Sequence, residues 1–255
     1  MQNIKIVNNI DFVYSLKPLK HGEGGFAKCY FYDSDNIIKV YFDLVSSSCI
    51  ALDDMEETLG FKNSTYIFPH TVYKNKDNQL LSTVQNYISG TNLDCLKRKV
   101  NIDDFFNSID KVVEDTKIVA DNAIVTSDIA ASNMIYKPGK ITVIDSDFFS
   151  VQRYISPNKI LKIDMENVID ALLQYFTQNY NVFEDGYIQD FIKRNDHTYN
   201  LYSSLSSHMD DYKLLKEFIL CMVDTVERET KTEFQTIDQM QKAILRSRNI
   251  WFMQW

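Results

Sequence analysis

The stretch Asp128–Asn133 (Asp-Ile-Ala-Ala-Ser-Asn), together with the hairpin after it and Asp145 at the hairpin's end, decides how we interpret this chain. Asn133 follows Asp128 by five residues, and Asp145 follows Asn133 by twelve. Between them, residues 134–136 and 141–144 flank a Lys-Pro-Gly-Lys turn, which predicts a β-hairpin. The spacing therefore predicts that three oxygen-bearing side chains lie close together, where the loop joins the open end of the hairpin. Such ligands suit Mg²⁺, which keeps waters and bridges substrate phosphates. Taken singly, each is equally typical of a turn cap or a strand end.

Three of the chain's seven glycines, Gly22, Gly24 and Gly25, fall within four positions. Glycines ahead of a strand let the backbone approach phosphate oxygens and offer them N–H donors. The sequence Gly-Glu-Gly-Gly-Phe-Ala is not a Walker A loop, because no Gly-Lys-Ser/Thr follows. It is not a Rossmann fingerprint either, since a strand follows it in place of a helix. On its own, such a cluster is more typical of an ordinary turn.

A lysine in the next predicted strand gives the glycines a possible role. Residues 26–32 and 37–42 predict a hairpin, and Lys39 stands between two apolar neighbours in its second strand. Burying this ammonium is costly without an anionic partner, and a phosphate beneath the glycine loop would supply one. A helix expected over 48–60 offers a second partner in Glu56, which shares a helical face with the apolar residues. Alternatively, Lys39 is a surface residue of an edge strand.

Composition excludes several classes of protein. The chain has 27 basic and 35 acidic residues, a net charge of -8, which argues against a nucleic-acid or anionic-membrane surface. Its four cysteines contain no CxxC pair, so we expect thiols in a reducing compartment and neither disulfides nor zinc. We find no signal-peptide pattern and no apolar run near the ~20 residues that span a bilayer. We therefore expect a soluble, cytoplasmic protein.

The character of the sequence changes along its length. Up to about residue 93, short strand-like runs alternate with turns, including a run over 80–88. Beyond residue 100, apolar residues recur at helical spacing over 109–116, 168–176 and 214–222. The pattern indicates an α+β chain whose strand-rich and helical parts join near residue 88.

In their order and spacing, these parts resemble the protein-kinase superfamily. The resemblance covers about residues 20–180 and rests on motifs: glycine-rich loop, strand lysine, helix glutamate, catalytic-loop aspartate and asparagine, and magnesium aspartate. It implies a two-lobed protein-kinase-like fold. Residues 1–88 would form a small β-rich N-lobe, and residues 89–255 would form a larger α-helical C-lobe. It also implies ATP and Mg²⁺ as cofactors.

The resemblance assigns roles at the reacting phosphate. Lys39, held by Glu56, would orient the α- and β-phosphates. Asp128 would align the acceptor hydroxyl and take its proton, while Asn133 and Asp145 would hold magnesium. Catalysis would then be mainly positioning and electrostatic stabilisation.

The resemblance also assigns the nucleotide contacts. The glycine loop would cover the phosphates, and Gln85, Asn86 and Ile88 would belong to the gatekeeper and hinge segment that holds adenine. Asn92 stands where the family often contacts ribose. Asp164 resembles the buried aspartate that braces the catalytic loop, and it is an equally good helix N-cap.

The chain departs from the family pattern at several positions, including Ala27 in place of the third loop glycine and Ala130 in place of the catalytic-loop lysine of Ser/Thr kinases. Thr126 and Ser127 replace the His-Arg that usually precedes the catalytic aspartate, so we expect a site assembled without activation-loop phosphorylation. The Asp-Phe-Gly motif is Asp145-Ser146-Asp147 here, which keeps the metal ligand without the hydrophobic switch. Asp147 is either a second metal carboxylate or a solvated turn residue.

Three hypotheses for the function stay open, and the first two differ in the acceptor of the phosphoryl group. The strand-rich motifs favour an atypical protein kinase acting on Ser, Thr or Tyr. The short span of about 18 residues between Asp145 and Asp164 favours a small-molecule kinase similar to aminoglycoside phosphotransferases. A pseudokinase or interaction module is the third. The expected partners are ATP and an unidentified protein or small-molecule hydroxyl acceptor, with no nucleic acid and no membrane.

Overall fold

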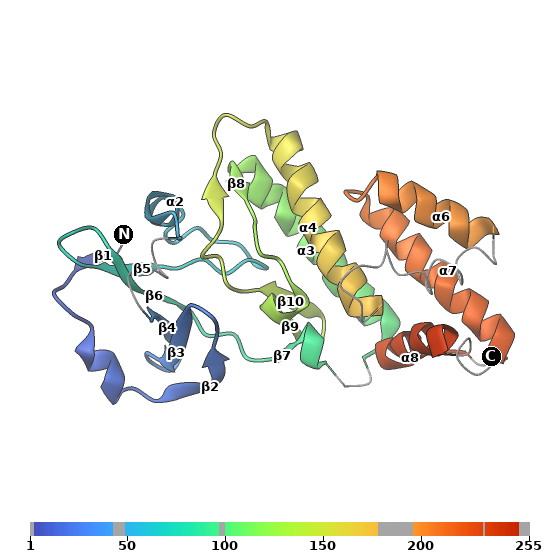
Figure 1. Ribbon diagram of the computed structural model, residues 1–255, viewed down its shortest axis with the longest axis horizontal. Coiled ribbons are helices and arrows are strands. Elements are labelled where there is room, and N and C mark those ends of the chain that lie inside the picture. The colour runs from blue at the N-terminus through green and yellow to red at the C-terminus, as the bar shows by residue number, and fades with distance from the viewer. Residues whose placement is uncertain (1–2, 43–48, 97–99, 178–195, 232, 250–255) are drawn as a thin grey trace.

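The computed structural model describes residues 3–42, 49–96, 100–177, 196–231 and 233–249. These residues form a mixed α and β protein in which a β-sheet part precedes a helical part (Figure 1). Six α-helices lie in the described residues. The expectation of a chain with both a β-sheet part and α-helices is confirmed at this level.

The strand-rich part is one six-stranded sheet with the order β1-β5-β6-β4-β3-β2. Its strands are β1 (Asn3–Ile6), β2 (Pro18–Glu23), β3 (Ala27–Phe31), β4 (Asn36–Tyr41), β5 (Thr71–Lys74) and β6 (Leu80–Asn86). All neighbours pair antiparallel except β1 and β5, which are parallel. The predicted strands over 26–32, 37–42 and 80–88 are therefore confirmed within one or two residues at their ends.

The β3–β4 hairpin is fixed by its turn. Asp33 Oδ1 accepts the backbone N–H groups of Asp35 and Asn36, both at 2.8 Å, so the side chain replaces backbone bonds that the turn cannot make. In the resulting register Cys29 lies opposite Lys39. Residues directly opposite share a face of the sheet, so both side chains lie on the same side.

A short helix packs beside the sheet. The helix α2 (Leu52–Glu57) is shorter than the 48–60 predicted, and residue 48 of that region lies outside the described ranges. Met55 and Leu59 are buried in a cluster with the strand residues Ala27, Tyr41 and Val72. The chain turns away at Gly60, whose φ of 72° suits glycine. A 3-10 turn, η1 (Asp11–Ser15), precedes β2.

The helical part contains five α-helices and several short strands. The helices are α3 (Ile102–Asp121), α4 (Pro157–Thr177), α6 (Asp196–Ser207), α7 (Tyr212–Thr230) and α8 (Ile237–Asn249). The short elements are β7 (Thr91–Asn92), β8 (Ile124–Val125), β9 (Met134–Lys137), β10 (Lys140–Val143), β11 (Ser150–Val151), η2 (Leu93–Cys95) and η3 (Ala131–Asn133). The predicted hairpin at 134–144 is β9–β10, and the three predicted helical stretches lie in α3, α4 and α7.

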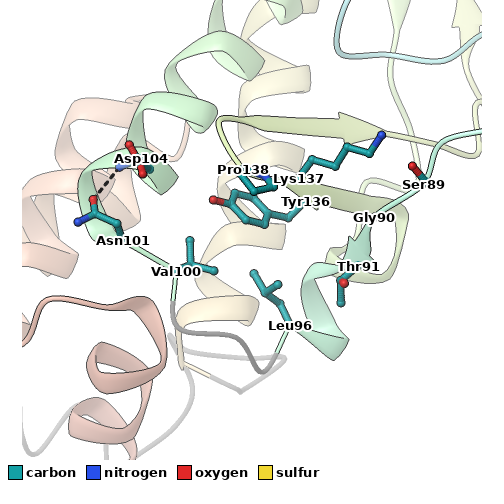
Figure 2. Close-up of a pocket in the computed structure, with 10 residues that line it drawn as sticks. All are labelled: Ser89, Gly90, Thr91, Leu96, Val100, Asn101, Asp104, Tyr136, Lys137 and Pro138. Carbon is teal, nitrogen blue, oxygen red and sulfur yellow. Dashed lines mark hydrogen bonds between the residues drawn. The ribbon is translucent and has the colours of Figure 1, made fainter.

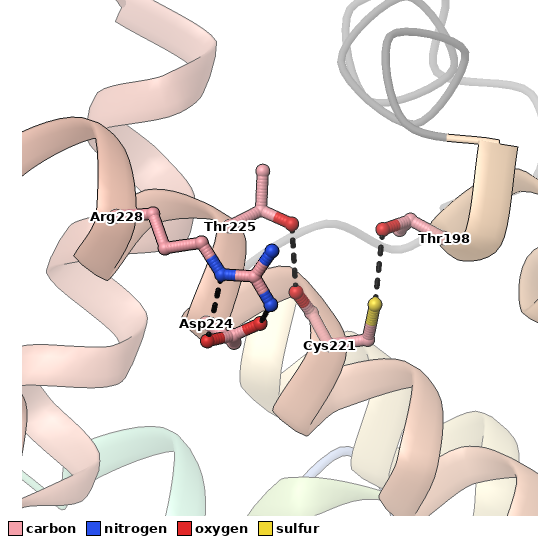
Figure 3. Close-up of polar contacts among 5 residues, drawn as sticks. All are labelled: Thr198, Cys221, Asp224, Thr225 and Arg228. Atoms are coloured by element: carbon pink, nitrogen blue, oxygen red, sulfur yellow. Dashed lines mark hydrogen bonds and ion pairs between the residues drawn. The ribbon is translucent and has the colours of Figure 1, made fainter.

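The main core lies between α3 and α4. Phe105 on α3 is fully buried, and its ring centroid lies 5.6 Å from that of Tyr175 and 5.8 Å from that of Phe176 on α4. Figure 1 shows these two helices between the sheet and the group α6, α7 and α8. In that group, Thr198 Oγ1 on α6 lies 3.1 Å from Cys221 Sγ on α7 (Figure 3). In the described ranges no helix is long and apolar enough to cross a membrane.

A loop after α2 ties the sheet to α3. The Tyr66 hydroxyl lies 2.7 Å from Thr116 Oγ1, and both groups are buried. The Ser64 hydroxyl donates to Asp115 Oδ2, and Asn63 Nδ2 donates to the Asp115 carbonyl at 3.3 Å. Buried polar bonds of this kind fix how the sheet and α3 face one another, so the residues that they carry meet in one place.

Candidate active site

Lys39 joins the two parts of the structure. Its Nζ lies 2.5 Å from Asp145 Oδ1 and 2.7 Å from Asp147 Oδ2. Burial alone would lower the pKa of Lys39, but the carboxylates of Asp147 and then Asp145 outweigh it and raise that pKa. The ammonium therefore stays charged. Lys39 and Asp145 stand 106 positions apart in the chain, and the order of the motifs placed both in one site without predicting that they contact each other.

The prediction of an ion pair between Lys39 and Glu56 is wrong. Glu56 Oε1 instead lies 2.5 Å from Nζ of Lys74 on β5. In the sheet, β6 separates β5 from β4, so a carboxylate that reaches β5 is directed away from Lys39. The helical face was predicted correctly, because Met55 and Leu59 are buried. The partner of Glu56 was not.

Two of the predicted site residues have an unusual backbone. Asp128 has φ 57° and Asp145 has φ 69°, in the left-handed region where residues other than glycine are uncommon. Such conformations cost roughly 1–3 kcal/mol each and persist where the surroundings over-determine them. They concentrate at functional sites, and among the described residues with this conformation, which also include Asn78, Ala123 and Lys231, are the two aspartates that the sequence singled out.

The loop before Asp128 is held from inside α4. The Thr126 N–H donates to Asp164 Oδ1 at 2.7 Å, and Asn167 Nδ2 donates to the Thr126 carbonyl at 2.7 Å. Asp164 is fully buried and stands well inside α4, which begins at Pro157. The brace is confirmed and the helix N-cap alternative is wrong.

Asn133 fixes the other end of the same loop. Its Nδ2 donates to the Asp128 carbonyl at 3.0 Å, and its own carbonyl accepts the Ile144 N–H at 2.8 Å. With Nδ2 engaged, Oδ1 is the atom of this amide that could bind a cation. Asp145 follows Ile144 directly, so Asn133 and Asp145 stand on neighbouring segments. Both could hold Mg²⁺, which takes oxygen ligands.

Asp128 is exposed to solvent at the edge of the site. Partial burial raises its pKa, Asp145 raises it further, and Lys39 opposes both effects. Asp128 is therefore close enough to Lys39 and Asp145 for their charges to affect its pKa. A carboxylate in this position could accept a proton from a bound hydroxyl group.

Asp147 is not a solvated turn residue. It is buried, and its side chain is 2% exposed. Burial raises its pKa, while Lys39 lowers it through charge and hydrogen bonding. One of its oxygens contacts Lys39 directly. Sequence reasoning missed this pairing, because the only signal was a second aspartate two residues after Asp145.

Ser146 stands where the family motif has a phenylalanine, and it cannot make the apolar contacts of that ring. Phe148 and Phe149, which follow it, make apolar contacts in this segment. Phe149 is 4% exposed, and its ring centroid lies 5.7 Å from that of Phe68 and 6.1 Å from that of Tyr66. Phe148 packs against the sheet-side cluster. The segment after Asp145 is thus anchored in the core by Phe148 and Phe149, although it lacks the phenylalanine of the family's hydrophobic switch.

The glycines act in two different ways. A Cβ on Gly22 would lie 2.8 Å from Leu19 Cβ, so close packing within the hairpin requires glycine there. A Cβ on Gly24 or Gly25 would meet nothing within 4 Å, so these two leave open space. The adjacent Phe26 ring meets Phe148 with centroids 5.9 Å apart, which brings the loop over the segment after Asp145.

The predicted gatekeeper and hinge segment begins in the last residues of β6 and continues beyond it. Gln85 is buried, Asn86 is exposed, and the Tyr87 N–H donates to the Asp35 carbonyl at 2.7 Å. Among the described residues, neither backbone group of Ile88 takes part in a hydrogen bond. Both could therefore serve a planar ligand with a donor and an acceptor edge, such as adenine.

Asn92 has a protein partner. Its Nδ2 donates to the Ser132 carbonyl, which links β7 to the turn before Asn133. Asn92 thus helps to fix the loop, and Oδ1 is the part of its amide that could bind a ligand.

The sheet face that carries Lys39 also carries buried polar atoms. In the described part of the chain, Tyr41 Oη, Thr83 Oγ1 and Gln85 Oε1 have no hydrogen-bond partner. Burial raises the pKa of Tyr41 strongly, and Asp147 raises it further. Such atoms are rare in folded proteins and mark places where a ligand or ordered water belongs. They fit a nucleotide site on this face.

A separate cavity lies beside the segment that joins the two parts. Its volume is about 580 Å³, and Ser89, Gly90, Leu96, Tyr136 and Asp104 are among its lining residues (Figure 2). It contains none of the predicted catalytic or metal-binding residues. The cavity is therefore separate from the group of Lys39, Asp128, Asn133 and Asp145.

Comparison with known proteins adds no assignment. No protein-family model matches the sequence, and a search of curated proteins finds no match. The arrangement of Lys39, Asp128, Asn133 and Asp145 therefore has to carry any functional conclusion.

Proposed function

We propose that this protein is an ATP-dependent phosphotransferase with a two-lobed protein-kinase-like fold, and that it acts as an atypical protein kinase. The observation that carries the proposal is the contact of Lys39 with Asp145, at 2.5 Å, beside a loop that presents Asp128 and Asn133. A lysine from a sheet and an aspartate from a separate hairpin are brought together there. That is the combination needed to orient a phosphate chain and its metal ion.

The arrangement of elements supports the proposed fold. The sheet with α2 precedes the helical part, and the loop around Asp128 rests on α4 through Asp164. In this proposal, residues 1–88 are the N-lobe and residues 89–255 are the C-lobe. The nucleotide would lie between them, below the turn formed by Gly24 and Gly25.

The residues divide the work by their chemistry. Lys39, charged and mostly buried, would hold phosphate oxygens. Asp128, exposed and close enough to Asp145 to feel its charge, would align the acceptor hydroxyl and take its proton. Asn133 and Asp145 would hold magnesium. MgATP, when bound, would supply the phosphoryl group and the metal charge that offsets negative charge on it. Backbone groups of Ile88, beside Gln85 and Asn86, would hold adenine.

The acceptor class rests on a separate observation. After Asp145 the chain forms β11, pairs it with β8 and enters α4 at Pro157. Only residues 146–156 lie between the metal aspartate and that helix, which leaves little platform for an extended peptide. The short segment is the reason to consider a small-molecule hydroxyl as a second candidate acceptor. A protein hydroxyl stays the first candidate, because the motifs in the sheet part resemble those of protein kinases.

Transfer of labelled phosphate tests the proposal. ATP labelled on its terminal phosphate is incubated with the purified protein and magnesium, and the label is followed into the protein, general protein substrates and small hydroxyl compounds. Asp128→Ala and Asp145→Ala should each abolish transfer. Asp121→Ala, at an exposed position on α3, is the matched control and should leave transfer unchanged.

The outcomes separate the three hypotheses. Label on protein, lost in both site variants, supports the protein-kinase function. Label on a small compound alone supports the second acceptor class. If nothing is labelled and MgATP does not shift the melting temperature, the catalytic proposal is wrong and an interaction module remains.

A further inference from the structure

The environment of Lys39 contains two carboxylates, and both come from the same three-residue segment. Asp145 Oδ1 lies 2.5 Å from Nζ, and Asp147 Oδ2 lies 2.7 Å from it. The Lys39 side chain is 12% exposed, so its charge is neutralised by protein groups and little by water. A buried ammonium requires such partners, because burying it unpaired costs several kcal/mol.

The two carboxylates differ in access. The Asp145 side chain is 31% exposed, whereas that of Asp147 is 2% exposed. Asp145 follows the Ile144 N–H that bonds to Asn133, so it stands at the open side of the site. Asp147 is enclosed by the protein and lies near Tyr41. A metal ion that keeps several waters can therefore reach Asp145 and not Asp147.

The two glutamates of α2 have other partners. Glu56 pairs with Lys74 on β5 at 2.5 Å, and Glu57 pairs with Arg153 after β11. These pairs attach the helix to the outer sheet and to the segment after Asp145. Neither helps to place Lys39.

We propose that Asp147 is the residue that positions Lys39 for the nucleotide, in place of a glutamate from α2. This inference rests on the proposed phosphotransferase function. Asp145, which also contacts Lys39, would exchange that contact for the metal ion, while Asp147 would keep its contact with Lys39. Because Asp145 and Asp147 belong to one short segment, the lysine and the metal ligand are placed together.

This arrangement has a consequence for control of the site. Where a helix glutamate holds the lysine, movement of that helix assembles or disassembles the site. Here Phe149, two residues after Asp147, is buried between Tyr66 and Phe68 and anchors the segment to the core. The Lys39 position should therefore be independent of α2.

Nucleotide affinity of two matched variants tests the inference. Asp147→Asn and Glu56→Gln each remove one carboxylate charge and keep the size of the side chain. ADP binding is measured by calorimetry with and without magnesium, on protein whose folding is checked by its melting temperature. Since Lys39 contacts phosphate directly, Asp147→Asn should weaken ADP binding at least tenfold in both conditions. Glu56→Gln should change it less than threefold.

Turnover gives the second readout. Asp147→Asn should lower kcat/KM for ATP about 100-fold, the scale expected when a catalytic group is displaced by about 1 Å. The magnesium concentration at half-maximal rate should stay unchanged. Glu56→Gln should keep kcat/KM within threefold of the wild type.

Two results would overturn the inference while leaving the proposed function intact. If Asp147→Asn weakens ADP binding only with magnesium, and excess magnesium restores the rate, Asp147 is a metal ligand. If Glu56→Gln loses as much activity as Lys39→Ala, the helix glutamate positions the lysine after all. The Glu56→Gln result holds even if Asp147→Asn does not fold. If the wild type binds neither ADP nor MgATP, the proposed function itself fails.

Discussion

The Thr126 N–H donates a 2.7 Å hydrogen bond to Asp164 Oδ1, so a carboxyl group buried in α4 supports the loop that presents Asp128. In the described part of the chain, the second oxygen of Asp164 has no hydrogen-bond partner. Burial raises the pKa of Asp164 to about 7, although its bonds to Thr126 act in the opposite direction. The support of the loop and the protonation of Asp164 are therefore linked.

The first prediction concerns stability and pH. The folded pKa of Asp164, about 7, lies above its usual value of 3.8. Between these values the folded protein holds a proton that the unfolded chain has lost, so stability falls as pH rises through this window. At about 1.4 kcal/mol per pH unit, the loss attributable to Asp164 reaches at most about 4 kcal/mol. Below pH 3.8 this contribution is fully present.

The measurement compares two pH profiles. Urea unfolding of the wild type and Asp164→Asn is recorded from pH 4 to pH 8, and the difference between the two free energies is plotted. The variant is neutral throughout and keeps an acceptor for the Thr126 N–H. Its stability relative to the wild type should increase from pH 4 to pH 7 and level off above. A flat difference would show that Asp164 titrates normally.

Sequence patterns predicted most of the fold because they depend on local rules. Strand alternation over 26–32 and 37–42 and the helical periodicity of 168–176 each reflect burial of one face, which short-range sequence determines. Motif order assigned Lys39 and Asp145 to one site but did not pair them with each other. Their approach across 106 positions is a property of the tertiary structure that no periodicity encodes.

The missed contacts have a common physical cause. The face of α2 was predicted correctly, but the strand beneath it depends on how the helix lies on the sheet, so Glu56 was assigned to Lys39 when it contacts Lys74. Asp147 was treated as a metal ligand or a turn residue, since the sequence does not tell which of two nearby aspartates is enclosed. Partner choice between like side chains is decided by packing.

The second prediction concerns the protonation of Asp128. Its pKa is raised by burial and by Asp145, and lowered by Lys39. Asp145→Asn should therefore lower the pKa of Asp128, and Lys39→Met should raise it further. Carbon-13 titration of labelled aspartate carboxyls measures both, with the signal assigned through Asp128→Asn. In the wild type, the transfer rate should fall as pH drops through this raised pKa, because the base must be ionised. Shifts of the same sign in both variants would contradict the electrostatic account.

The third prediction concerns the segment that joins the two parts. A Cβ on Gly90 would lie 2.4 Å from Ile135 Cγ2 and 2.7 Å from the Tyr136 carbonyl oxygen. The carbonyl belongs to β9 and cannot move alone, so Gly90→Ala should cost about 1–3 kcal/mol of unfolding free energy. Gly25→Ala is the matched control, because its Cβ would meet nothing within 4 Å. Urea unfolding should show it within about 0.5 kcal/mol of the wild type. Equal losses in the two variants would mean that the close contact at Gly90 is not maintained in solution.

The fourth prediction compares two phenylalanines of the candidate site. Phe149 is 4% exposed and packs between Tyr66 and Phe68, so Phe149→Ala should lower the free energy of unfolding by about 3–5 kcal/mol. Phe26 is 46% exposed at the glycine loop, and Phe26→Ala should cost less than about 1 kcal/mol. Chemical denaturation of both variants measures the difference.

Nucleotide affinity of the same variants separates anchoring from closure. Phe149→Leu keeps an apolar side chain in the core, so it should fold and retain the Lys39–Asp147 contact with a smaller loss of stability. If the segment is anchored as described, its affinity for MgADP should stay near that of the wild type. Phe26→Ala removes the ring that meets Phe148 and should weaken that affinity without a matching loss of stability. A Phe149→Leu variant that is stable yet no longer binds MgADP would show that the shape of the ring, and not its burial, sets the position of Asp147.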